Sequence, residues 1–109
     1  MGLTRTDIFT DEQNALADVA KVLGHPARIA ILEHLIQQNS CVCGDLVNEI
    51  GLAQATISQH LKELKRVGLI KGTVEGTSMC YCIDVETWEK TAGQIGALFG
   101  RGILSANCC

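Results

Sequence analysis

The sequence predicts a mostly helical domain with one small β-hairpin, in the order of four helices, two strands and a final helix. Apolar residues recur at helical spacing in four segments before Gly68. Two alternating, strand-like segments then flank Glu75 and Gly76, and helical spacing returns after Asp84. The 109 residues, 47% hydrophobic and 19% charged, predict a single globular domain over residues 1–109.

The first two helices are bounded by residues that suit helix ends. A helix from about Phe9 to Leu23 has Thr10 or Asp11 available as its N-cap, and Gly24 can end it. Pro26 suits the first position of a second helix, which runs to about Gln38, because its missing N–H leaves no bond unmade there. The residues expected to face the core are Leu16, Val19, Ala20 and Leu23, followed by Ile29, Leu32, Leu35 and Ile36.

The third and fourth helices are separated by only about three residues that include Gly51. The third is expected from about Cys41 to Ile50 and the fourth from Gln54 to about Val67. Two short helices joined in this way are typical of a helix-turn-helix. Their inward residues are expected to be Val42, Leu46, Val47 and Ile50, followed by Ile57, Leu61 and Leu64.

A hairpin and a last helix complete the predicted chain. Gly68 closes the fourth helix, and strands over Leu69–Val74 and Thr77–Ile83 form a wing. The last helix begins near Asp84, a suitable cap, and repeats apolar residues at Val85, Trp88, Ala92, Ile95 and Phe99. This order of elements, α-α-α-α-β-β-α, is that of a winged helix-turn-helix.

The fourth helix is locally basic, which favours a nucleic-acid contact. From Gln54 to Lys71 there are four cations and one anion, a formal charge of +3, whereas the whole chain carries −3 and the remainder therefore −6. The second helix of a helix-turn-helix lies in the major groove, with its first residues at base edges, and later cations suit phosphates. The candidate DNA contacts are Gln54, Ala55, Thr56, Ser58, Gln59, His60, Lys62, Lys65 and Arg66. For His60, hydrogen-bonded packing beside Ile57 and Leu61 is an equally good interpretation.

Six cysteines suggest thiol chemistry. Residues 1–109 contain no run of eighteen apolar residues and no basic-then-apolar leader, so we expect a cytoplasmic protein with free thiols and no membrane partner. Cys41 and Cys43 fall at the predicted start of the third helix, where the helix dipole would stabilise thiolates. Thiolates are soft ligands, and trivalent arsenic or antimony fits that preference.

The chain resembles the ArsR/SmtB family of winged-helix metalloregulators. The matching stretches are Val22–Leu35 (VLGHPARIAILEHL), Cys41–Leu46 (CVCGDL), Leu52–Ile70 (LAQATISQHLKELKRVGLI) and the wing through Tyr81. The resemblance implies a homodimeric repressor that pairs through its first and last helices and leaves double-stranded operator DNA when an inducer binds. One departure is Ala53, where relatives often carry a capping Ser or Thr, and the poorer cap costs on the order of 1 kcal/mol.

The Cys41–Leu46 stretch resembles the arsenic-sensing CVC-D-L motif of the family, with two departures. Gly44 is inserted before Asp45, and Val47 stands where some relatives carry a third cysteine. The third sulfur is therefore expected from Cys108 or Cys109, within the subunit or across the dimer. Alternatively, this tail pair forms its own site for a methylated trivalent arsenical, which needs only two sulfurs. For Cys80 and Cys82, which share one strand face, a surface or packing role is slightly favoured over soft-metal binding.

Other metal and functional hypotheses follow from the same residues. The family's zinc and cobalt sites use Asp and His on the last helix. Here Glu86 stands where the first His would fall and no His follows, so zinc is not expected and no cofactor is required. Ligation at Cys41 and Cys43 is expected to reorient the third helix and so displace the fourth.

The sequence also allows three alternatives to an arsenic- or antimony-sensing repressor to be compared: a thiol-based sensor, a thiol enzyme and an interaction module. The cysteines could form a redox or persulfide sensor that joins distant thiols. A thiol enzyme is not expected, because the chain has no C-x-x-C and no Cys–His pair with suitable spacing. An interaction module without DNA binding is disfavoured by the basic fourth helix.

Overall fold

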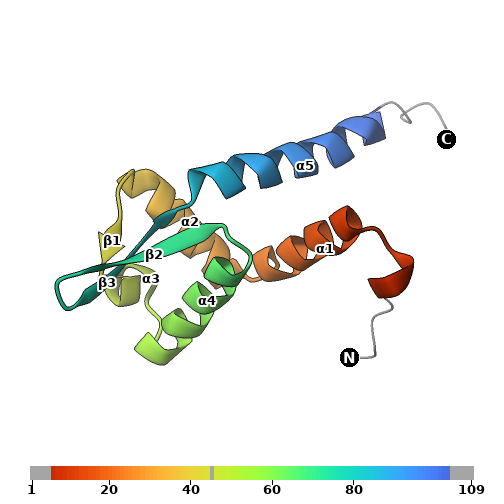
Figure 1. Ribbon diagram of the computed structural model, residues 1–109. Helices are drawn as coiled ribbons and strands as arrows, with labels where there is room; N and C mark the ends of the chain where they lie inside the picture. The colour runs from red at the N-terminus through yellow and green to blue at the C-terminus, as the bar shows by residue number, and fades with distance from the viewer. Residues whose placement is uncertain (1–5, 45, 104–109) are drawn as a thin grey trace.

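The computed structural model describes residues 6–44 and 46–103, and it confirms the predicted winged helix-turn-helix (Figure 1). A 3₁₀ turn, η1, precedes the helices, and a short strand, β1, lies between α2 and α3. The elements are η1 (Thr6–Ile8), α1 (Asp11–Leu23), α2 (Pro26–Gln38), β1 (Val42–Cys43), α3 (Leu46–Ile50), α4 (Gln54–Arg66), β2 (Ile70–Glu75), β3 (Ser78–Ile83) and α5 (Val85–Ile103).

The helix ends lie where the capping residues predict them. The Thr10 hydroxyl accepts from the Gln13 N–H at 3.0 Å, and the Gln13 side chain accepts from the Thr10 N–H, forming a capping box. Pro26 begins α2, with His25 as its N-cap. Asp84 caps α5 by accepting from the Thr87 N–H at 3.3 Å.

The prediction of one helix from Cys41 to Ile50 is wrong in its first half. Val42 and Cys43 form β1, which pairs antiparallel with β3, and α3 begins only at Leu46. Between β1 and α3, Gly44 has φ +88°, a left-handed conformation that favours glycine and ends the strand. The sheet therefore has three strands in the order β1-β3-β2, and not the two of the predicted hairpin.

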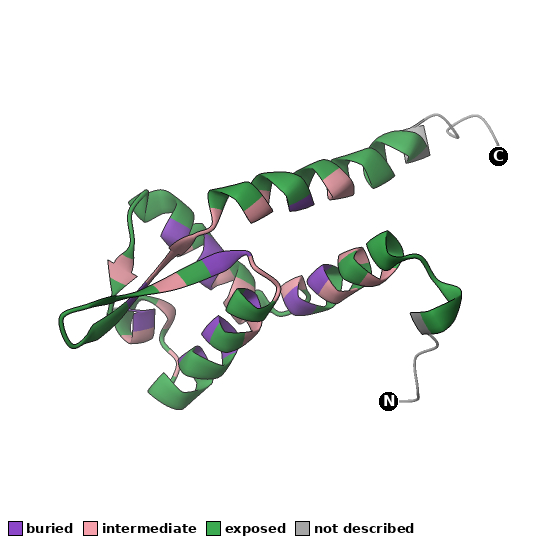
Figure 2. Cartoon of the chain, in the orientation of Figure 1, coloured by how far each residue is buried: buried purple, intermediate pink, exposed green. Residues whose placement is uncertain are grey.

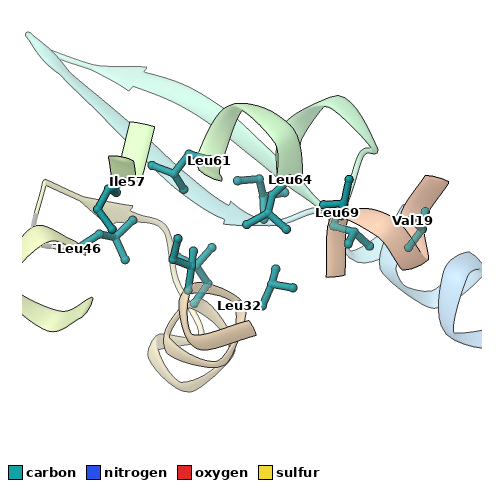
Figure 3. Packing of buried hydrophobic residues seen from close by; sticks show 11 residues of the cluster. Val19, Leu32, Leu46, Ile57, Leu61, Leu64 and Leu69 are labelled. Atoms are coloured by element: carbon teal, nitrogen blue, oxygen red, sulfur yellow. The ribbon is translucent and has the colours of Figure 1, made fainter. Parts of the chain in front are cut away.

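The core lies where α2, α3 and α4 meet the base of the sheet (Figure 2). Leu46 of α3, Ile57, Leu61 and Leu64 of α4, and Leu69 converge on Leu32 of α2, while Val19 of α1 extends the cluster toward α5 (Figure 3). This cluster fixes α4 against the rest of the domain, so that the opposite face of α4 is left to solvent.

The predicted inward face of α2 is partly wrong. Leu32 and Leu35 are buried as expected, but Ile31 is completely buried as well. Ile29 and Ile36 are 41% and 49% exposed. The helix is apolar on more than one side, so its sequence alone does not select the face that packs.

Candidate DNA-binding surface and cysteine cluster

The outer face of α4 carries most of the predicted DNA contacts. Helix α4 buries Ile57, Leu61 and Leu64 and turns its polar side chains outward. The predicted DNA contacts that are exposed are Gln54, Ala55, Thr56, Ser58, Gln59, Lys62, Lys65 and Arg66. The Gln54 amide donates to the Ser58 hydroxyl at 3.1 Å, which aligns two groups that can read base edges along one turn of the helix.

His60 lies on the inner side of α4 and not on its outer face. Only 6% of the residue is exposed, and its Nδ1 accepts from the Arg28 Nε at 3.1 Å. Its ring centroid lies 4.4 Å from that of His25. Burial, and then the nearby His25 and Arg28, lower the pKa of His60. The structure therefore places His60 in the packing role and removes it from the candidate DNA contacts.

Arg66 is exposed but already paired. Its guanidinium donates to both carboxylate oxygens of Asp18 on α1, at 2.8 and 3.0 Å, and also to Glu63. The bidentate hydrogen bond from Arg66 holds the pKa of Asp18 below its usual value. Arg66 thus connects the end of α4 to α1. A phosphate that binds Arg66 would compete with the carboxylates of Asp18 and Glu63. Lys62 and Lys65 have no ion pair among the contacts of the described residues.

The wing and the start of α4 enclose an open cavity of about 350 Å³. Gln54 and Ser58 of α4 line one side, and Met79 and Tyr81 of β3 line the other. Gly44, between β1 and α3, completes it. A structural change in β1 or β3 would therefore reach Gln54 and Ser58, two of the predicted DNA contacts.

Four cysteines meet where β1 pairs with β3. The antiparallel register places Val42 opposite Tyr81 and Cys43 opposite Cys80. Cys43 and Cys80 are joined by a disulfide, with their Cα atoms 4.1 Å apart. Two residues away from this pair, Cys41, which directly precedes β1, lies beside Cys82 of β3, and both are free thiols. Side chains two residues apart in extended backbone share a face, so the C-x-C of residues 41–43, which ends in β1, lies against the C-x-C of β3. We call these four residues the cysteine cluster.

Two predictions about these cysteines are wrong. The expectation of free thiols fails for Cys43 and Cys80, which form the disulfide. Cys41 and Cys43 also precede α3, so the dipole argument for stabilised thiolates does not apply to them. The surface or packing role favoured for Cys80 and Cys82 missed their pairing with β1, although Cys80 is indeed completely buried. Cys108 and Cys109 lie outside the described residues.

Glu75, which the sequence did not mark as a functional residue, lies beside Cys43 and Cys80 of the cysteine cluster. Its Oε2 lies 3.7 Å from the Cys43 Sγ and 3.5 Å from the Cys80 Sγ. One ligand atom from each of these three residues falls within 4.8 Å of the others. Once the disulfide is reduced, two sulfurs and a carboxylate oxygen could bind a thiophilic ion here. The only sequence signal was the position of Glu75 at the tip of the wing, on the strand that pairs with β3.

The two free thiols, Cys41 and Cys82, differ in their exposure. Cys41 is exposed, whereas Cys82 is half-buried. Burial raises the pKa of the Cys82 thiol, and a hydrogen bond with Cys41 adds to that effect. Cys82 therefore keeps its proton to higher pH than an ordinary thiol, and a ligand that binds it must displace that proton.

Comparison with known proteins identifies the family. Residues 25–71 match the model of the family described as bacterial regulatory protein, arsR family. MJ1325 from Methanocaldococcus jannaschii, an HTH-type transcriptional regulator, is 41% identical over 70 residues, which cover 62% of this chain and 78% of that protein. The chain belongs to the ArsR family. Members of this kind are transcriptional regulators, and no enzyme family is indicated.

Solved structures of other members share the fold. Rv0081 from Mycobacterium tuberculosis superposes with a TM-score of 0.66 at 28% identity, covering 93% of this chain and all of that one. Its sequence is 39% identical over 67 residues, which cover 62% of this chain but only 59% of the full relative. The homodimeric winged helix-turn-helix domain of Mb0332 from Mycobacterium bovis, at 24% identity, gives a TM-score of 0.67, with coverages of 95% and 93%. Across the described residues, no helix is both long and apolar enough to cross a bilayer.

Proposed function

We propose that this ArsR-family chain is a homodimeric transcriptional repressor that binds double-stranded operator DNA through α4 and the wing. The exposed face of α4 supports this, since Gln54, Ser58 and Gln59 offer base-edge hydrogen bonds at its start. Lys62 and Lys65 follow, exposed and without an ion pair to any described residue, and their charges suit phosphates. Lys62→Ala should weaken binding to all sequences similarly and reduce the salt dependence by about one counterion.

We further propose that trivalent arsenic or antimony bound by the cysteine cluster releases the DNA. The observation that carries this proposal is the β1–β3 register, which brings Cys43 against Cys80 and Cys41 beside Cys82. In the reduced protein, Cys43 and Cys80 would supply two sulfurs, and Cys41 or Cys82 the third. Arsenous acid would then exchange three hydroxyls for three thiolates and release three waters. Cys108 and Cys109 stay as alternative donors of the third sulfur.

The connection from the cluster to DNA is short. Cys43 ends β1, Gly44 follows, and α3 packs against α4 as the first helix of the helix-turn-helix. An ion that pulls Cys43 toward the other sulfur ligands would move this connection and tilt α3. The inducer must bind the released form more tightly than the DNA-bound form, with a coupling of about 1–3 kcal/mol in typical allosteric proteins.

Operator release measured in reducing buffer tests the arsenic proposal. A DNA site selected by the protein from a random library serves as the probe, and arsenite is titrated against wild type, Cys43→Ser, Cys80→Ser and the double variant Cys108→Ser/Cys109→Ser. We expect loss of the response in the first two variants and its retention in the third. An undiminished response in Cys43→Ser would exclude the cluster, and loss only in the tail variant would move the site to the tail.

A redox-controlled repressor is the second candidate, and the Cys43–Cys80 disulfide itself favours it. Oxidation of the two thiols by a peroxide would form the S–S bond and pass two electrons and two protons to the oxidant, which becomes water. Hydrogen peroxide without arsenite should then change operator affinity in wild type and in Cys41→Ser, but not in Cys43→Ser. An unchanged affinity in wild type, despite complete loss of these two thiols, would exclude this candidate.

A further inference from the structure

A second cavity, on the other side of the cysteine cluster, contains two thiols that belong to no disulfide. It has a volume of about 330 Å³ and lies where the end of α2 meets the outer ends of β1 and β3 and the start of α5. Its lining includes Leu35, Ile36, Cys41, Cys82, Ile83 and Trp88, together with the polar Asn39 and Ser40 at the end of α2. Four of these residues are large and apolar, and the two thiols lie together at one side.

The two thiols are placed to act together. Cys41 and Cys82 continue the register that pairs Cys43 with Cys80, and they are hydrogen bonded to each other. A single atom that forms two bonds to sulfur could therefore bind both without a change of strand pairing. The Cys43–Cys80 disulfide leaves these thiols as the free pair of the cluster.

We propose that Cys41 and Cys82 form a binding site for a monosubstituted trivalent organoarsenical whose organic group occupies the cavity beside Trp88. Such a compound, R–As(OH)₂, has two exchangeable oxygens and one carbon substituent. Two As–S bonds form, two As–O bonds break, and the thiol protons leave in two water molecules, with no change in oxidation state. The two thiols match the two exchangeable positions, and the apolar wall matches the substituent.

Inorganic arsenite fits this pair less well. After two thiols have reacted, its third hydroxyl remains, and this group buries no apolar surface against Leu35, Ile83 and Trp88, which an organic substituent would do. The site thus deepens the proposed function, on which it rests, by naming a ligand class and a pair of residues distinct from Cys43 and Cys80.

Trp88 provides a direct reporter because it is the single tryptophan of the chain and lines the cavity. Phenylarsine oxide, which hydrates to the R–As(OH)₂ form, is titrated into the DNA-free protein while Trp88 emission and free thiols are followed. We expect one equivalent to consume two thiols and change the emission. The protein is titrated without reductant, so that the disulfide keeps Cys43 and Cys80 from reacting. Cys41→Ser and Cys82→Ser should each weaken binding at least tenfold, whereas Cys108→Ser/Cys109→Ser should bind as wild type does.

A pocket variant separates the organic group from the thiols. Ile36 is 49% exposed, so Ile36→Ser should fold normally. It should weaken phenylarsine oxide several-fold and leave methylarsonous acid, whose substituent is small, nearly unchanged. Undiminished binding in Cys41→Ser, or loss of binding only in the tail variant, would overturn the proposal.

Because this titration contains no DNA, its result tests the organoarsenical site independently of the proposed repressor function. Binding at Cys41 and Cys82 without any effect on operator affinity would refute induction through this site and leave the site itself intact. Operator release by phenylarsine oxide that persists in both Cys41→Ser and Cys82→Ser would refute the site and leave the repressor function intact.

Discussion

Ala53 is the N-cap of α4, and its methyl side chain offers no acceptor for the first N–H groups of that helix. Its backbone has the extended conformation of an N-cap, φ −62° and ψ 151°, but no side-chain hydrogen bond is made. Ala53→Ser adds a hydroxyl at this position and should raise the free energy of unfolding by about 1 kcal/mol. Urea unfolding with an unchanged m-value measures it. Ala55→Ser, which adds the same hydroxyl inside the helix, is the control and should give no gain.

His60 makes stability depend on pH. The folded protein lowers the pKa of His60 below its usual 6.5, so below that value the unfolded chain binds a proton that the folded protein resists. Stability should therefore fall as the pH drops through about 6.5 and level off below the folded pKa. His60→Gln keeps a polar side chain that does not titrate, and it should make the free energy of unfolding less dependent on pH in this window. An identical slope in the variant would assign the pH dependence to other groups.

At the scale of elements, the Cys43–Cys80 disulfide fastens β1 to the wing. Only two residues of β1 pair with β3, so the crosslink contributes much of what holds this strand. It closes a loop with a sequence separation of 37, for which loop-closure entropy gives an upper bound of about 4 kcal/mol. A reductant should lower the free energy of unfolding of wild type by up to that amount and leave Cys43→Ala unaffected. Cys41→Ala, which keeps the disulfide, should respond to the reductant as wild type does.

The elements that the sequence predicted well are those with local signals. Thr10 and Asp84 mark helix starts through hydrogen bonds to residues three positions further on, and Pro26 does so through its missing N–H; each lies at the helix start that it predicts. β1 was missed because its pairing with β3 depends on a strand far away in the sequence. Val42 is half-buried in the strand, and a single apolar residue between two cysteines could not separate a strand from a helical turn.

The same non-local pairing explains what was missed at the cysteine cluster. The alternation of Cys80 and Cys82 on one strand face, and the C-x-C at Cys41 and Cys43, were both readable from the sequence. Which thiols oppose one another depends on the β1–β3 register, since a shift by one residue would turn the cysteines to opposite faces. The exposed face of α4 was predictable because its helical periodicity is local. His60 was ambiguous because its partner Arg28 lies on another helix.

For the whole molecule, α1 and α5 extend from the core on the same side (Figure 1). Large apolar side chains on α5 and just before α1 are exposed. Leu98 and Phe99 of α5 are 48% and 71% exposed, and Ile8 and Phe9 before α1 are also exposed. These are the segments through which the family resemblance implies a dimer. A second copy packed on them would bury this surface and place two α4 helices on one duplex.

Phe99→Glu tests this arrangement, because a carboxylate at the centre of an apolar interface would be buried without a partner. We expect wild type to sediment as a dimer and the variant as a monomer with unchanged helical content. Operator affinity should fall at least about tenfold, since one monomer engages only a single half-site. Ile36→Glu, an exposed apolar position on α2, is the matched control and should stay dimeric. A dimeric Phe99→Glu protein would show that the subunits pair through another surface and that α5 has a different partner.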